Sequence, residues 1–129
     1  MKELALGTKG EAETQVDESR LACTVGSGSL PVYATPMMVA LMEQAACAAL
    51  APFLTEEETS VGCRISVSHT AATPVGMQVR AEAQVTALSG RMVEFSVLAW
   101  DASGPIGEGT HTRAVVLRDR FLQKTYEKL

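Results

Sequence analysis

The sequence of 129 residues predicts an α+β fold in which an antiparallel sheet wraps around one long, buried helix. The first observation is a stretch from Met37 to Leu50 that is apolar except for Glu43 and Gln44, as expected of a helix buried on most sides. The second is that the segments after residue 60 alternate between apolar and polar residues, which is typical of half-buried strands. Short turns rich in Gly, Pro and Ser separate these segments and indicate antiparallel hairpins.

Composition limits the classes of partner. The chain is long enough for one domain with a sizeable core, and its net charge of −4 without any Lys/Arg block argues against nucleic acid. The polar N-terminus lacks the apolar region of a secretory signal, so we expect a cytoplasmic protein. The apolar helix is shorter than the ~20 residues needed to span a bilayer, so we expect no membrane partner.

The cysteines predict no disulfide framework. Cys23, Cys47 and Cys63 are odd in number, form no metal-binding spacing and lie in apolar stretches, so we expect reduced, buried thiols. Neither a cluster of metal ligands nor a glycine-rich phosphate loop follows a strand, so we expect no metal and no cofactor.

The first half of the chain predicts one strand and the helix. Residues 1–19 are polar and weakly periodic and are expected to be partly extended, and a first strand is expected near residues 20–25. Thr35 is a good helix N-cap and Pro36 suits the first helical position, so the helix is expected to begin there and to end near Ala51. The acidic run Glu56–Glu58 is expected to be a solvated turn.

The second half predicts four strands joined by turns. Between Val61 and His69 the odd positions are mostly apolar, which puts His69 at the end of the inward face of a strand. The other expected strands are Met77–Ala87, Met92–Trp100 and Ile106–Leu117, before a charged tail at 118–129.

The order of elements is therefore strand, helix and four antiparallel strands, which is the hotdog architecture in a single domain, 1–129. A helix this apolar needs more cover than one curved sheet supplies. A homodimer with two sheets joined edge to edge would supply that cover and hide an edge strand.

Two titratable residues are expected to face inward. An ionised carboxylate at Glu43 would cost several kcal/mol unless it is paired, hydrogen-bonded or protonated, so Glu43 is a candidate functional residue. A His near a carboxylate can act as a general acid or base, which makes His69 a second candidate. The structural alternatives are a Glu43 that reaches solvent or caps an amine, and a His69 that is a satisfied core residue. We expect His111 to be an ordinary histidine on a strand surface.

Four stretches share one family pattern: Tyr33–Met38 followed by Glu43, Ser60–Gly62, Ser68–Gly76 and Gly107–Arg113. Together they resemble the fluoroacetyl-CoA thioesterase family of hotdog proteins, over most of the chain between residues 20 and 117. The resemblance implies hydrolysis of an acyl-CoA thioester by a threonine, a glutamate and a histidine, which by position are Thr35, Glu43 and His69. It also implies that Gly62 and Arg113 lie at or near the substrate.

One segment departs from the family. The fluoroacetyl-specific member carries a longer, aromatic-rich stretch ahead of the threonine, whereas Gly26–Pro31 is short and contains no Phe. A short-chain acyl-CoA thioesterase is therefore the expected activity, with the acyl group, and CoA or acyl-carrier protein as the carrier, left open.

Helix geometry bears on how the site is assembled. Residues eight apart on a straight helix lie ~12 Å apart along its axis, so Thr35 and Glu43 of one chain should not touch. We therefore expect a composite site, with at least one of the three groups supplied by the second subunit. Thr35 either attacks the thioester or positions it, and the N–H of Met37 or Met38 at the helix start is the expected oxyanion donor.

Two other functions remain open from the sequence. Hotdog folds also serve as non-catalytic acyl-CoA or acyl-lipid binding modules, but such a module has no need for Thr35, Glu43 and His69 together. A hotdog hydratase or dehydratase would use a His and an acidic residue and would leave Thr35 idle.

Overall fold

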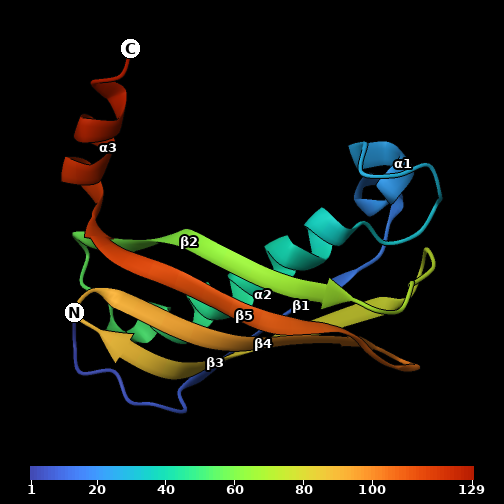
Figure 1. Cartoon of the computed structure of the whole chain (residues 1–129), viewed down its shortest axis with the longest axis horizontal. Coiled ribbons are helices and arrows are strands. Elements are labelled where there is room, and N and C mark those ends of the chain that lie inside the picture. The colour runs from blue at the N-terminus through green and yellow to red at the C-terminus, as the bar shows by residue number, and fades with distance from the viewer.

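The computed structural model describes residues 1–129 and contains one curled antiparallel sheet with a long helix against its concave face (Figure 1). The strands are β1 (Lys9–Gln15), β2 (Glu58–His69), β3 (Gln78–Ser89), β4 (Met92–Asp101) and β5 (Gly104–Leu117). Their order in the sheet is β1-β3-β4-β5-β2, so β1 and β2 form the two edges. The helices are α1 (Ala22–Val25), α2 (Thr35–Leu50) and α3 (Arg118–Tyr126). The predicted α+β class, the long helix and the last four strands are confirmed.

The core lies between α2 and the sheet. Seven residues of α2 are buried: Met38, Leu41, Met42, Ala45, Ala46, Ala49 and Leu50. They pack mainly against β1 and β3, where alternate residues such as Val79, Ala81 and Ala83 are fully buried. A Cβ at Gly10 would overlap the α2 backbone at Ala45 and Ala49, so only glycine lets β1 lie this close to the helix.

One stripe of α2 is left uncovered. Pro36, Gln44, Cys47 and Ala48 are exposed, because the helix lies nearer to β1 and β3 than to β2. By length and composition Thr35–Phe53 could cross a membrane, a test that the core helix of a water-soluble protein also passes. The prediction that α2 is buried on most sides holds on its sheet side and is wrong for this stripe.

The predicted strand at 20–25 is wrong. Residues Glu18–Arg20 form a 3₁₀ turn and Ala22–Val25 form α1, which ends at Gly26 in the left-handed conformation with φ 85°. The Asp17 carboxylate accepts a hydrogen bond from the Ser19 N–H at 3.0 Å, and this side-chain cap favours the turn over a strand. The first strand is instead β1, which lies within the polar segment 1–19.

The sequence predicted the end of α2 correctly but not the residue that caps its start. Helix α2 ends at Leu50 and continues as a 3₁₀ turn, Ala51–Phe53, as the sequence predicts. At its start, however, Ala34 is the N-cap residue and no side chain caps the helix, so the prediction of Thr35 as the cap is wrong.

Strand β2 contains an irregularity that pattern reading missed. Gly62 pairs with Arg113 and Arg64 pairs with Thr112, so Cys63 is one extra residue, a β-bulge. The bulge changes which residues face α2, from even-numbered ones before it to odd-numbered ones after it. The predicted inward positions after the bulge, including His69, are confirmed, whereas those at Val61 and Cys63 are wrong.

Two further expectations about burial are wrong. Glu56 and Glu57 form an exposed turn, as predicted, but Glu58 is buried at the start of β2, where its carboxylate accepts a hydrogen bond from the Thr55 N–H at 3.0 Å. The three cysteines are free thiols, as predicted, but all of them are exposed, because they lie on the outer sides of α1, α2 and the bulge.

Candidate active site

A threonine–histidine pair joins the start of α2 to the end of β2. Thr35 Oγ1 lies 2.7 Å from His69 Nδ1, and the buried Tyr33 ring meets the imidazole edge-on with centroids 6.5 Å apart. The other ring nitrogen of His69, Nε2, is buried and has no hydrogen-bond partner. Burial lowers the pKa of His69 from its usual value, and the nearby backbone of Ala71 partly offsets this. The ring is therefore neutral near pH 7 and can accept a proton.

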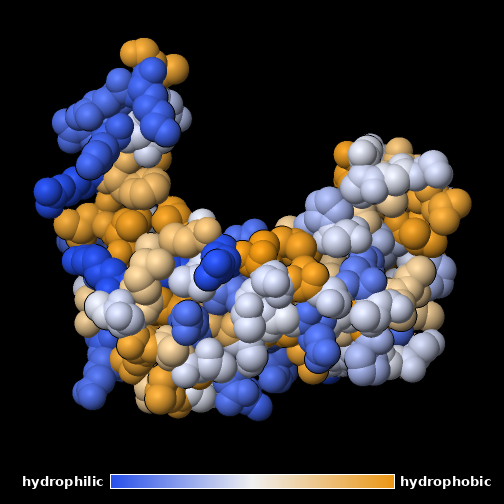
Figure 2. Space-filling view, in the orientation of Figure 1, coloured by the Kyte–Doolittle hydropathy of each residue, from blue (hydrophilic) through white to orange (hydrophobic).

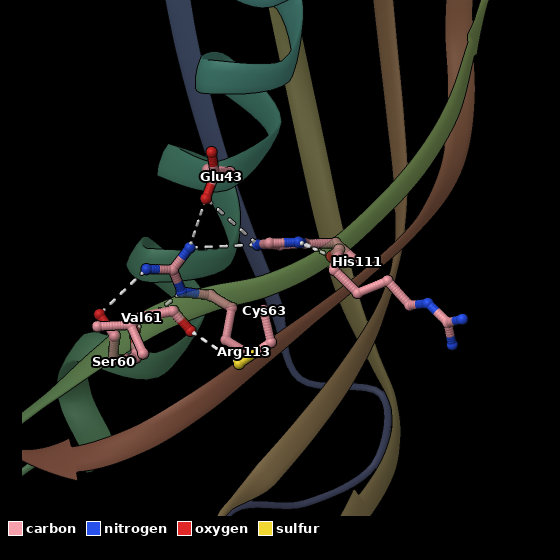
Figure 3. A network of polar contacts seen from close by, with 7 residues as sticks. Glu43, Ser60, Val61, Cys63, His111 and Arg113 are labelled. Carbon is pink, nitrogen blue, oxygen red and sulfur yellow. Dashed lines mark hydrogen bonds and ion pairs between the residues drawn. The ribbon is translucent and has the colours of Figure 1, made fainter.

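A second polar cluster surrounds Glu43 in the middle of α2 (Figure 3). Arg113 on β5 donates from Nη1 to Glu43 Oε2 at 3.0 Å. The same guanidinium donates from Nε to Ser60 Oγ at 2.9 Å and from Nη2 to the Ser60 carbonyl at 3.1 Å. His111 Nε2 lies 3.2 Å from Arg113 Nη1 and 3.8 Å from Glu43 Oε2. The carboxylate is thus held by a fixed cation.

Gly62 leaves the room that this cluster needs. It pairs with Arg113 across the β2–β5 ladder, on the face toward α2. A Cβ at Gly62 would lie 2.5 Å from Glu43 Oε2 and 3.3 Å from Arg113 Nη1, closer than real contacts allow for the carboxylate. Any side chain here would displace Glu43.

The ion pair explains how a carboxylate is tolerated in an apolar helix. The Glu43 side chain is 39% exposed and is paired with Arg113, and pairing is one of the conditions under which an ionised carboxylate is expected in this helix. A paired, partly solvated carboxylate avoids most of the desolvation cost.

Within one chain the predicted residues form two groups. Thr35 contacts His69, whereas Glu43 contacts Arg113 and borders Gly62, and no hydrogen bond or ion pair joins the groups. This agrees with the separation expected from eight residues of helix, and Thr35 Oγ1 does not bond to Glu43 of its own chain.

Sequence reasoning missed two members of the Glu43 cluster. His111 is only 2% exposed and contacts the cluster, so the prediction of a strand-surface histidine is wrong. Since alternate residues of a strand share a face, its position two residues before Arg113 was the available signal. Ser60 could not have been found, because the bulge reverses the face it occupies.

The expected oxyanion donors are already occupied. The N–H groups of Met37 and Met38 both donate to the Ala34 carbonyl, at 3.0 and 3.1 Å. The N–H of Thr35 itself donates to no carbonyl of the backbone, so it is the free donor beside the Thr35 hydroxyl.

Comparison with known proteins gives one consistent family. A family model described as fluoroacetyl-CoA-specific thioesterase matches residues 16–119. The chain is 44% identical over 97 residues to a fluoroacetyl-CoA thioesterase of Streptantibioticus cattleyicolor, covering 75% of this chain and 70% of that protein.

Solved structures agree with this in fold. A crystal structure of a variant of a fluoroacetyl-CoA-specific thioesterase superposes with a TM-score of 0.93 at 33% identity, covering 100% of both chains. A thioesterase superfamily member from Thermus thermophilus gives a TM-score of 0.87 at 29% identity, also over 100% of both chains. A hot-dog-like protein from Thermanaerovibrio acidaminovorans gives 0.87 at 26% identity, over 98% of this chain and 93% of that one. The predicted hotdog fold is confirmed.

Proposed function

The chain belongs to the fluoroacetyl-CoA-specific thioesterase family, and from that premise we propose that it hydrolyses short-chain acyl-CoA thioesters to the free acid and CoA. The observation that carries this proposal is the Thr35 hydroxyl held 2.7 Å from a neutral imidazole, that of His69. A hydroxyl hydrogen-bonded to a base is the arrangement that activates a weak oxygen nucleophile. A non-catalytic binding module would have no use for it.

Thr35 and His69 supply the proton chemistry. With His69 neutral, Nδ1 can take the hydroxyl proton as Thr35 Oγ1 attacks the thioester carbonyl, or as Thr35 orients an attacking water. The thiolate leaves as the C–S bond breaks and takes the proton from the His69 imidazolium. Where Thr35 is the nucleophile, water then attacks the acyl-threonine ester, which releases the acid and restores the Thr35 hydroxyl. The free N–H of Thr35 is the candidate donor to the oxyanion, in place of the occupied N–H groups of Met37 and Met38. The chemistry requires no metal and no redox cofactor.

We propose that a homodimer completes the site, with the Glu43 of one subunit meeting the Thr35–His69 pair of the other. Three features support this assembly. Strand β2 is an unpaired edge, α2 leaves an uncharged stripe without cover, and His69 Nε2 is buried without a partner. Helix α3 and the α1 segment rise on either side of the β2 edge, with apolar residues between them (Figures 1 and 2).

The acyl group is proposed to be short but not specifically fluorinated. The segment Gly26–Pro31 contains no aromatic residue, and its one large apolar side chain, Leu30, is 63% exposed. It therefore offers little to shield a pocket from water.

The first experiment measures thiol release from acyl-CoAs of two to eight or so carbons, and from the matching acyl-pantetheines and acyl-carrier proteins. Thr35→Ala, Glu43→Ala and His69→Ala should each lower kcat/KM by about 10²–10⁴-fold, the range for removing an acid–base or nucleophilic group. Full activity of Glu43→Ala would refute the scheme. Binding of acyl-CoA without turnover would indicate a binding module, and hydration of an enoyl-CoA would indicate a hydratase.

Mixed dimers test the composite site. Thr35→Ala and Glu43→Ala chains, each inactive alone, are unfolded, mixed in equal amounts and refolded. About half of the dimers would be mixed and carry one intact site of two, so about a quarter of wild-type activity should return. No return of activity, with mixed dimers detected by mass spectrometry, would put all three groups in one subunit.

A further inference from the structure

We infer that His111 is a positioning residue, which accepts a hydrogen bond from Arg113 as a neutral imidazole and so holds the guanidinium against Glu43. This inference rests on the proposed function for its kinetic consequence, and on the geometry of the Glu43 cluster for its structural content (Figure 3).

The contacts of the ring fix its tautomer. His111 Nδ1 lies 2.7 Å from the carbonyl oxygen of Arg64. A carbonyl oxygen can only accept, so Nδ1 carries the proton. In the neutral ring Nε2 then has a free lone pair, and it lies 3.2 Å from Nη1 of Arg113, which can only donate. Both ring nitrogens are therefore satisfied by one protonation state.

The surroundings leave the imidazole no alternative position. His111 is 2% exposed and stacks on Phe95 of β4, with centroids 6.2 Å apart and an angle of 27° between the planes. The Arg64 carbonyl that orients it lies directly after the extra residue of the β2 bulge. The bulge thus provides the acceptor that fixes the ring, as second-layer partners orient the ligands of metal sites.

Protonation would reverse the effect of His111. The charged and titratable groups facing it are Arg113 on its own strand and Glu43 on α2; β2 contributes the Arg64 carbonyl and β4 the Phe95 ring. An imidazolium would place a second cation against Arg113 and would compete for Glu43 Oε2, 3.8 Å away. Burial lowers the pKa of His111 below its usual value, the Arg64 carbonyl and Glu43 partly offset this, and Arg113 acts in the same direction as burial, so the ring is neutral at pH 7.

Two variants separate the two nitrogens. His111→Gln places an amide oxygen near the position of Nε2 and can still accept from Arg113. His111→Asn places its amide near Nδ1 and can still donate to the Arg64 carbonyl, but leaves Arg113 without its acceptor. The His111→Asn variant should lower kcat by about 10–100-fold and change KM by less than about three-fold. The His111→Gln variant should retain most of the wild-type kcat. Equal losses in both variants, or no loss in either, would overturn the inference.

Nuclear magnetic resonance tests the structural content without any activity. The chain has only two histidines, so a long-range ¹H–¹⁵N spectrum contains two imidazole patterns, and His69→Gln assigns them. His111 should appear as the neutral Nδ1–H tautomer at pH 7. An Nε2–H tautomer or an imidazolium would refute the inference even if the enzyme hydrolyses acyl-CoA. Conversely, a protein that hydrolyses no thioester would refute the proposed function and leave the tautomer result standing.

Discussion

At the scale of single residues, the two histidines of the chain illustrate two uses of the same ring. His69 has one nitrogen on the Thr35 hydroxyl and the other, although buried, unpartnered, which leaves it ready for a reacting group or a neighbouring subunit. His111 has both nitrogens satisfied within the chain. The first arrangement suits proton transfer, and the second suits support.

Gly62→Ala should impair activity while preserving the fold. The added Cβ would meet the Glu43 carboxylate at 2.5 Å, and that carboxylate is the end of a flexible side chain that can move away. We expect kcat/KM to fall by roughly 10–100-fold and the free energy of unfolding to change by less than about 1 kcal/mol. Gly28→Ala, whose Cβ would make only an ordinary contact with Ala22, is the matched control and should retain activity. Wild-type activity in Gly62→Ala would contradict the site geometry.

The histidines also predict how stability depends on pH. Burial lowers the pKa of both His69 and His111 below the ordinary value of 6.5. Below pH 6.5 the unfolded chain therefore binds protons that the folded chain does not, so stability falls as the pH drops through this window and is constant above it. Urea unfolding between pH 5 and 8 should show this, and His69→Gln/His111→Gln should flatten it. A wild-type protein more stable at pH 5.5 than at pH 7.5 would have raised histidine pKa values instead.

At the scale of elements, the loop after β2 is tied to the end of β4. Thr73 is fully buried and donates from Oγ1 to Asp101 Oδ2 at 2.7 Å, while its carbonyl accepts from the N–H of Tyr33 at 2.9 Å. These bonds hold the loop next to both His69 and the segment that leads into Thr35. The position of the Thr35–His69 pair thus depends on an anchor outside the candidate site.

The Thr73→Val variant measures how much the Thr73–Asp101 hydrogen bond contributes to stability. The variant removes the hydroxyl and leaves the Asp101 carboxylate without one of its hydrogen-bond donors. We therefore expect the free energy of unfolding to fall by about 1–3 kcal/mol. Thr110→Val, on the exposed face of β5, is the control and should change stability by less than about 0.5 kcal/mol. Urea midpoints compare the two. Equal stability of both variants would mean that the hydrogen bond contributes nothing net.

Helices and strands with a clear hydrophobic pattern were predictable from the sequence, and those without such a pattern were not. Helix α2 was found because a long, nearly continuous apolar run follows the start signal Thr35–Pro36, and strand β3 because its apolar residues alternate with polar ones without interruption. Strand β1 is an edge strand of polar residues around Gly10, so it carries no such pattern. The α1 turn depends on the Asp17 cap, a contact between side chain and backbone that hydrophobic periodicity does not register.

The candidate site divides along the same line. Glu43 and His69 were predicted from chemistry and from resemblance, and Thr35, Gly62 and Arg113 from resemblance alone. Their partners, Ser60 and His111, became visible only when the register of β2 against β5 was known. The single extra residue of the β2 bulge sets that register, and the local pattern of apolar and polar residues does not predict where the bulge lies.

At the scale of the whole molecule, the proposed dimer interface consists of the uncovered stripe of α2 and the free edge of β2. A charge placed in this interface should therefore produce a monomer. Ala48→Glu places a charge on that stripe, so we expect it to dissociate the proposed dimer and, since the proposed site needs both subunits, to abolish most activity. Ala102→Glu, at the exposed turn after β4, is the matched control and should stay dimeric and active. Light scattering gives the mass. An active Ala48→Glu monomer would show that one chain is sufficient.

The bulge at Cys63 also shows where a deletion would act on this protein. Deleting Cys63 would join Gly62 to Arg64 and leave each paired as before, with Arg113 and Thr112, in an unbroken ladder. Because residues paired across a ladder share a face, Ser60 and Gly62 would still face α2 together with Arg113. The change would fall instead on the backbone at Arg64, whose carbonyl orients His111, so the loss of one codon would disturb the support of the carboxylate without replacing any side chain of the Glu43 cluster.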